Sequence, residues 1–178
     1  LSYIFNKFSD EKKDFFSILK EAGEKGFTEP DPREDLSGND VARKLLILSR
    51  EIDYKHELTD VDIESLIPDT IKKETSIEDF FKEEALINQY YENKIDTLNE
   101  NEVLRYIGDL NEEGKLSVKL TKVEKNSNLG NLRGADSIFE IYTESYGDNP
   151  IVIQGAGAGS EVTARGVYSD LLRISAIS

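Results

Sequence analysis

Apolar residues recur at helical spacing through the first half of the chain. A helix is predicted over residues 8–25, with Gly26 ending it, and its apolar face consists of Phe15, Ile18, Leu19 and Ala22. A second helix is predicted over residues 39–52, with Ser37 as its N-cap and Asp40 three residues later in the spacing of a capping box. Its apolar face consists of Val41, Leu45, Leu48 and Ile52.

Two prolines separate these helices. Pro30 and Pro32 lie within residues 29–35, and each disfavours helical geometry at the residue before it, so the segment is predicted to be a non-helical loop. Residues 59–68 are predicted to form a short helical turn followed by a loop. Residues 76–98 form a longer predicted helix.

The pattern changes to that of strands in the second half. Strands are predicted over residues 102–110 and 115–123, joined by a hairpin turn in which Gly114 is suited to a positive φ. Polar residues alternate with apolar ones along the second of these strands, so one sheet face is predicted to be solvated; the polar positions are Ser117, Lys119 and Thr121.

Two more strands are predicted over residues 138–146 and 150–154, followed by a last helix over residues 160–174. Because helices come first and strands afterwards, the predicted fold class is α+β. We expect a largely antiparallel or mixed sheet with helices packed on one face.

Composition narrows the classes of function. With 178 residues the chain is long enough for one domain with a real core. A formal net charge of −14 argues against nucleic acid as a partner. No apolar run is long enough to span a bilayer, so no membrane is expected. The chain has no cysteine and one histidine, which removes thiolate catalysis and the common metal sites and fits a reducing compartment such as the cytoplasm.

The acidic segment over residues 29–35 is the first candidate site. Four carboxylates share it, namely Glu29, Asp31, Glu34 and Asp35. A solvated acidic turn is one reading, and a calcium loop is disfavoured because Arg33 occupies a position where a ligand would be required. A stiff loop of carboxylates can instead receive the ammonium group of a substrate, and Arg33 can pair with one of them.

Asp40 and Lys44 are four residues apart, so they share one face of the predicted helix. A surface ion pair of this kind ordinarily contributes little. Placed directly after the acidic loop, the pair has a second interpretation, because a lysine held by a carboxylate can exchange a proton with an alcohol or carbonyl oxygen.

The glycine-rich run over residues 155–159 follows a predicted strand and opens a predicted helix, a context that suits an anion at a helix N-terminus. It is not a dinucleotide fingerprint, because Ser160 stands where that motif requires Gly or Ala. A tight turn packed against another element is the alternative.

Three stretches of the chain resemble homoserine dehydrogenase. Residues 26–48, GFTEPDPREDLSGNDVARKLLIL, resemble the family's long signature, and their last part is closest to the type fused to an aspartokinase. Residues 1–6, LSYIFN, resemble the end of a second conserved segment. Residues 155–167 resemble the family's glycine-rich C-terminal return.

The resemblance implies a function and a set of roles. The family reduces L-aspartate 4-semialdehyde to L-homoserine with NADPH or NADH, on the route to threonine and methionine. By resemblance, Lys44 is the catalytic proton donor, supported by Asp40. The residues implied to bind the amino acid are Phe27, Thr28, Glu29, Asp35 and Asp40; Phe27 stands where many members carry Tyr. Gly157, Gly159 and Thr163 are implied to approach the nicotinamide cofactor, NADP or NAD.

The resemblance also implies how the chain relates to a larger enzyme. The family places a Rossmann domain before the segment where this chain begins, so residues 1–178 are expected to be the substrate-binding and dimerisation domain, inactive alone. Residues 155–178 are expected to return toward the nucleotide-binding domain, and a homodimer is expected to form through the sheet. A non-catalytic dimerisation module and an amino-acid-binding domain of the same fold are the alternatives, although a scaffold has no need of Glu29, Asp40 and Lys44 together.

Overall fold

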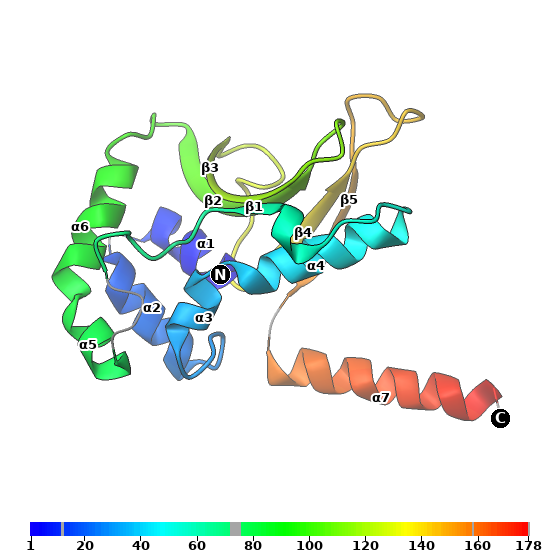
Figure 1. The fold of residues 1–178 in the computed structure, drawn as a ribbon, viewed down its shortest axis with the longest axis horizontal. Coiled ribbons are helices and arrows are strands. Elements are labelled where there is room, and N and C mark those ends of the chain that lie inside the picture. The colour runs from blue at the N-terminus through cyan, green and yellow to red at the C-terminus, as the bar shows by residue number, and fades with distance from the viewer. Residues whose placement is uncertain (12, 72–75, 158, 178) are drawn as a thin grey trace.

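The computed structural model describes residues 1–11, 13–71, 76–157 and 159–177, which form an α+β fold (Figure 1). The helices of the first half are α1 (Ser2–Asp10), α2 (Phe15–Glu24), α3 (Pro32–Leu36), α4 (Asn39–Glu51), α5 (Ile77–Lys82) and α6 (Glu84–Ile95). A short 3₁₀ turn, Leu58–Asp60, precedes the strands β1 (Val61–Ile63), β2 (Glu102–Leu110), β3 (Leu116–Glu124), β4 (Asp136–Ile141) and β5 (Ile151–Ala156). Helix α7 (Ser160–Ile177) ends the chain.

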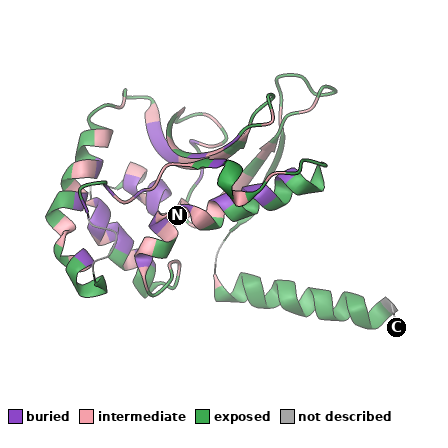
Figure 2. Ribbon diagram, in the orientation of Figure 1, coloured by how far each residue is buried: buried purple, intermediate pink, exposed green. Residues whose placement is uncertain are grey.

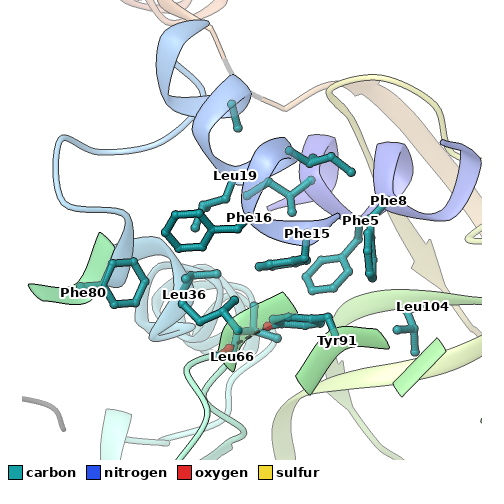
Figure 3. Packing of buried hydrophobic residues seen from close by; sticks show 14 of the residues in the cluster. Phe5, Phe8, Phe15, Phe16, Leu19, Leu36, Leu66, Phe80, Tyr91 and Leu104 are labelled. Atoms are coloured by element: carbon teal, nitrogen blue, oxygen red, sulfur yellow. Dashed lines mark hydrogen bonds between the residues drawn. The ribbon is translucent and has the colours of Figure 1, made fainter. Parts of the chain in front are cut away.

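The main core lies where the helices of the first half meet the sheet, and aromatic rings fill much of it (Figure 3). Phe15 of α2 stacks on Tyr91 of α6 with ring centroids 3.5 Å apart, and Phe5 of α1 packs beside both. The buried hydroxyl of Tyr91 donates a hydrogen bond of 2.7 Å to the carbonyl oxygen of Leu66. This contact satisfies the one polar group of the ring and ties the loop after β1 to α6.

Strands β1, β3 and β2 form a mixed sheet in that order, with β1 parallel and β2 antiparallel to β3. Helix α4 covers one face of this sheet and forms a second core cluster with it, from Ala42, Leu45, Leu46, Val61, Leu116 and Val118. Lys119 and Thr121 lie exposed on the opposite face, as the alternation of β3 predicts.

The second half also contains a separate antiparallel sheet of β4 and β5. Phe139, Ile141, Ile151 and Ile153 are paired across it on one face, and all four are exposed. Helix α7 lies apart from the other elements, and the residues of α7 whose burial the structure describes are exposed along its length (Figure 2).

The residue Arg105 joins three parts of the fold. Its side chain is buried on β2, where its guanidinium donates to the carbonyl oxygens of Leu129 and Gly130 at 3.0 and 2.8 Å. It also donates to the hydroxyl of Ser9 on α1 at 2.9 Å. These bonds hold the irregular segment after β3 against α1 and β2.

The prediction of one helix over residues 8–25 is wrong. Helix α1 begins at Ser2 and ends at Asp10, and α2 begins only at Phe15. Asp14 is the N-cap of α2, where its carboxylate accepts a hydrogen bond of 2.8 Å from the amide of Ser17. The cap of Asp14 starts a new helix inside a stretch whose apolar spacing alone predicts one continuous helix.

The prediction of a wholly non-helical loop over residues 29–35 is also wrong, because α3 begins at Pro32. The proline occupies the first turn, where its missing N–H is not needed, and Asp31 before it is extended. Asp31 caps the helix by accepting from the amide of Arg33 at 3.0 Å. The rule for the residue before proline therefore holds for Asp31 without extending to the residues that follow.

Three smaller predictions also need correction. The N-cap of α4 is Gly38 in a left-handed conformation, with no side-chain cap, so the capping box of Ser37 and Asp40 does not form. The short helical turn predicted at the start of residues 59–68 is present as the 3₁₀ turn Leu58–Asp60, but the strand β1 follows it where a loop was predicted. The single helix predicted over residues 76–98 is divided at Glu83 into α5 and α6; residues 72–75 lie outside the described chain.

Candidate functional site

Helix α4 carries the first part of the site, and Gly38 fixes where that helix begins. Gly38 has φ of 77°, and a Cβ atom on it would lie 2.0 Å from the hydroxyl oxygen of Tyr106. That hydroxyl donates a hydrogen bond of 2.6 Å to the carbonyl oxygen of Glu64. Glycine is thus required both by the backbone conformation and by the close approach of Tyr106.

Asp40 and Lys44 form the ion pair that their spacing predicts. Nζ of Lys44 lies 2.8 Å from Oδ2 of Asp40, and both side chains are 62% exposed. Leu45 and Leu46 pack beneath them into the sheet, so the backbone of α4 is rigid while the charged groups face outward. The lysine amine is therefore held in place and remains accessible.

The acidic segment is closed by its own hydrogen bonds. Oδ2 of Asp35 accepts from the backbone amide of Glu29 at 2.8 Å, which joins the two ends of the segment. Arg33 makes a close pair with Asp31, with Nη2 2.6 Å from Oδ2, and this pairing lowers the pKa of Asp31. The expectation that Arg33 pairs within the loop is confirmed. Asp31 is occupied by Arg33, while the carboxylate of Glu29 is exposed.

The acidic segment leads directly into the helix that carries Asp40 and Lys44. Asp35 lies on α3, and the amide of Gly38, the residue before α4, donates a hydrogen bond of 3.2 Å to the carbonyl oxygen of Asp35. Asp35 and the Asp40–Lys44 pair are thus carried by two neighbouring helices joined by two residues.

Phe27 and Thr28 lie at the entrance to the acidic segment, and both are half-buried. The amide of Phe27 donates a hydrogen bond of 2.9 Å to the carbonyl oxygen of Ala22 at the end of α2. The ring of Phe27 packs on Tyr3, with centroids 4.9 Å apart. The loop therefore leaves a helix end in a defined direction.

The site is an open surface rather than an enclosed pocket. Two hollows in the described structure, one lined by residues such as Phe8 and Leu98 and one by residues such as Tyr3 and Lys7, are not lined by Glu29, Asp35, Asp40 or Lys44. The side chains of Asp40 and Lys44 are exposed, so another protein surface can pack over this pair. Such an open arrangement can bind a small zwitterion tightly only if a further surface covers it.

The glycine-rich run shows two different environments. A Cβ on Gly157 would lie 2.0 Å from Oγ of Ser137, so this glycine allows β5 to pass close to β4. Gly159 has φ of 120° with open space at the Cβ position, and its carbonyl oxygen accepts from the amide of Thr163 at 3.2 Å. Residue 158 lies outside the described chain. The structure thus gives Gly157 a packing reason of its own and leaves the backbone of Gly159 approachable.

Sequence reasoning missed one cluster beside this site, formed by Tyr3, Lys7, Glu21 and Lys25. The carboxylate of Glu21 accepts from the hydroxyl of Tyr3 at 2.6 Å and from Lys25 at 2.8 Å, and it pairs with Lys7. These cations, Lys25 first, hold the pKa of Glu21 well below its usual range. The spacing of Glu21 and Lys25 by four residues was the only local signal, because Tyr3 and Lys7 come from another helix.

A comparison with families of known proteins matches residues 1–172 of the chain to the model described as homoserine dehydrogenase. The chain belongs to the homoserine dehydrogenase family. It is 42% identical to bifunctional aspartokinase/homoserine dehydrogenase 2, chloroplastic, of Arabidopsis thaliana, over 98% of this chain and 19% of that protein. It is 38% identical to a homoserine dehydrogenase of Paracoccidioides brasiliensis, over 98% of this chain and 50% of that protein. The chain thus spans between a fifth and a half of these relatives.

Solved structures agree on the fold. A Candida auris protein of unknown function superimposes with a TM-score of 0.87 at 37% identity, covering 98% of this chain and 50% of that chain. Homoserine dehydrogenase of S. aureus superimposes with a TM-score of 0.67 at 24% identity, over 98% of this chain and 40% of that one. The fold is therefore shared with a solved homoserine dehydrogenase over 98% of this chain.

Proposed function

We propose that residues 1–178 are the substrate-binding and dimerisation domain of a homoserine dehydrogenase, which interconverts L-homoserine and L-aspartate 4-semialdehyde with NAD(P)H in threonine and methionine biosynthesis. The observation that carries the proposal is the exposed Asp40–Lys44 ion pair at the start of α4, directly after an acidic segment closed by the bond from Glu29 to Asp35. A carboxylate for an ammonium group and an amine for a carbonyl oxygen are the groups that this substrate needs.

The proposed roles follow from the contacts. Glu29 is exposed and can receive the substrate ammonium, and Asp35 fixes the loop through its bond to the amide of Glu29 and is proposed to help hold that ammonium. During reduction of the aldehyde, a hydride adds to the carbonyl carbon and Lys44 gives a proton from Nζ to the carbonyl oxygen. In the reverse direction Lys44 takes the proton from the alcohol. Asp40 holds Nζ toward that oxygen through the 2.8 Å ion pair. Phe27 and Thr28, both half-buried, are proposed to line the substrate site on this open surface.

The proposed cofactor residues differ in the space around them. Gly159 and the first turn of α7 leave open backbone that a nicotinamide or phosphate group can approach, and Thr163 lies one turn further on. Gly157 fits less well, because Ser137 occupies the space beside it. A bound nicotinamide cofactor supplies the hydride. We therefore propose Gly159 and Thr163, with Gly157 shaping the turn, as the contribution of this domain to a NADP or NAD site.

A nucleotide-binding domain elsewhere in the protein is proposed to cover the open surface at Asp40 and Lys44 and to hold most of the cofactor. The exposure of α7 fits its return toward that domain (Figure 2). None of the described helices is both long and apolar enough to cross a membrane. The absence of cysteine suits a reducing compartment, and we propose the cytoplasm.

The proposal is tested by measuring homoserine-dependent reduction of NAD(P)⁺ by the full-length protein, followed by absorbance. We expect turnover by the full-length protein and none by residues 1–178 alone, because the hydride carrier has no complete site in this domain. Turnover by the 178-residue chain would contradict the proposal that the cofactor site is completed by another domain. A full-length protein that binds homoserine without turnover would favour the amino-acid-binding alternative.

We propose that the homodimer forms through the apolar face of β4 and β5. Phe139 and Ile153 face the same side and are 48% and 55% exposed. Exposed apolar residues grouped on one sheet face mark an interaction surface. A second copy of the same sheet is the partner that the family resemblance implies.

A charge on this face should separate the dimer. We expect Ile153→Asp to shift the protein from dimer to monomer in light scattering, because an aspartate would be desolvated at the contact. Val152→Asp is the matched control, since Val152 lies on the other face of the same strand. The dimer assignment fails if Ile153→Asp and Val152→Asp give the same mass as the unchanged protein.

A further inference from the structure

The cluster of Tyr3, Lys7, Glu21 and Lys25 joins helices α1 and α2 at the point where α2 ends. Glu21 accepts from both Tyr3 and Lys25, and Lys25 also donates to the hydroxyl of Tyr3 at 2.8 Å. Nζ of Lys7 donates to the same hydroxyl at 3.2 Å. The hydroxyl of Tyr3 is therefore held by three charged groups, which fixes the orientation of its ring.

The ring of Tyr3 faces Phe27, the first residue of the proposed substrate loop. The two rings are tilted by 37° with centroids 4.9 Å apart, a distance typical of a stabilising aromatic pair. Gly26, with φ of 71°, lies directly before Phe27, and its amide donates a hydrogen bond of 2.9 Å to the carbonyl oxygen of Gly23. The Tyr3 ring adds a side-chain contact to this turn, beside its backbone hydrogen bonds.

The path from Phe27 to the acidic groups is short. The amide of Phe27 bonds to the carbonyl of Ala22, and two residues later the amide of Glu29 bonds to the carboxylate of Asp35. Displacement of the Phe27 ring would therefore move the backbone that carries Glu29. A displacement of about 1 Å in a group that holds the substrate is enough to weaken binding or turnover substantially.

We propose that Tyr3 is a positioning residue for the amino-acid substrate: with Glu21 holding its hydroxyl, it packs on Phe27 and sets the position of Thr28 and Glu29. The inference rests on the proposed function for its effect on substrate, but its structural half stands on the contacts alone. Tyr3 itself does not touch the reacting atoms in this scheme.

The test combines hydrogen exchange with kinetics in the full-length protein. The variants are Tyr3→Leu, which removes ring and hydroxyl, and the milder Tyr3→Phe and Glu21→Gln, which keep the ring but loosen it. Glu84→Gln is the control, because it breaks another ion pair of α2, between Lys20 and Glu84 at 2.8 Å, away from the loop. Circular dichroism confirms that each variant is folded, and the two milder variants decide the test if Tyr3→Leu does not fold.

We expect faster exchange at the amides of Phe27 and Glu29 in Tyr3→Leu, with unchanged exchange in α6. We also expect KM for homoserine to rise about tenfold while kcat and KM for the cofactor change little. Tyr3→Phe and Glu21→Gln should show the same pattern to a smaller extent, and Glu84→Gln should not show it. A merely structural role would lower stability without this separation of KM from kcat.

Unchanged exchange at Phe27 and Glu29 in the folded variants would overturn the inference, as would faster exchange with an unchanged KM for homoserine. A failure of this inference can be distinguished from a failure of the proposed function. If the unchanged protein does not act on homoserine, the proposed function fails, and the exchange measurement alone then supports or overturns the anchoring of the loop by Tyr3.

Discussion

Lys44→Ala should lower kcat for homoserine oxidation by about 10²–10⁴-fold, the range for loss of a general acid or base. Lys44 is the amine paired with Asp40 directly after the acidic segment, so its removal leaves the substrate oxygen without a proton partner. The unfolding temperature should hardly change, because exposed ion pairs contribute little to stability. The measurement is steady-state kinetics of the full-length enzyme together with thermal unfolding.

Lys82→Ala provides the control for this prediction. Lys82 forms a comparable exposed ion pair with Asp79 on α5, at 2.6 Å, and has no proposed role in the reaction. Its kcat should match that of the unchanged enzyme. If Lys44→Ala keeps more than about a tenth of the original kcat, the proton transfer must come from another group.

Arg105→Ala should cause the largest loss of stability, at least about 3 kcal/mol, since several buried carbonyl oxygens would lose a charged donor. The guanidinium is 4% exposed and binds Leu129, Gly130 and Ser9, from two separate parts of the chain. The unfolding temperature should fall by roughly 6–12 °C. Calorimetry or circular dichroism measures this change directly.

Arg50→Ala is the matched control for Arg105. The guanidinium of Arg50 also donates to a backbone carbonyl, that of His56 at 2.8 Å, but its side chain is 46% exposed. Water can replace the lost bonds there, so the stability change should stay within about 1 kcal/mol. Equal losses of unfolding free energy in Arg105→Ala and Arg50→Ala would show that the burial of Arg105 does not determine its contribution to stability.

The parts of the fold that the sequence predicted are those with strong local signals. The helical spacing of apolar residues predicts α4, but its face was placed partly wrongly, because Leu48 and Ile52 are 44% and 60% exposed and the helix buries Ala42 and Leu46 beside Leu45 instead. The β2–β3 hairpin follows from alternation around Gly114. The break before Phe15 depends on one capping carboxylate, Asp14, inside an otherwise continuous apolar pattern. Strand β1 has three residues, and its parallel partner β3 lies far along the chain, so no local pattern could reveal it.

The same distinction between local and long-range contacts applies to the candidate site. The pairing of Asp40 with Lys44 follows from helical spacing, and the pairing of Arg33 with Asp31 follows from their closeness in sequence. The bond from Glu29 to Asp35 and the convergence of Asp35 with α4 need the turn made by α3, which was predicted as a loop. The contacts of Tyr3 and Arg105 could not be predicted, because their partners come from distant segments of the chain.

A crystal structure of the full-length protein with L-homoserine and oxidised cofactor tests the central claim most directly. We expect the substrate ammonium on the carboxylates of Glu29 and Asp35, and the substrate hydroxyl within hydrogen-bond distance of Nζ of Lys44. Homoserine bound at another surface, or bound with its hydroxyl turned away from Lys44, would contradict the claim.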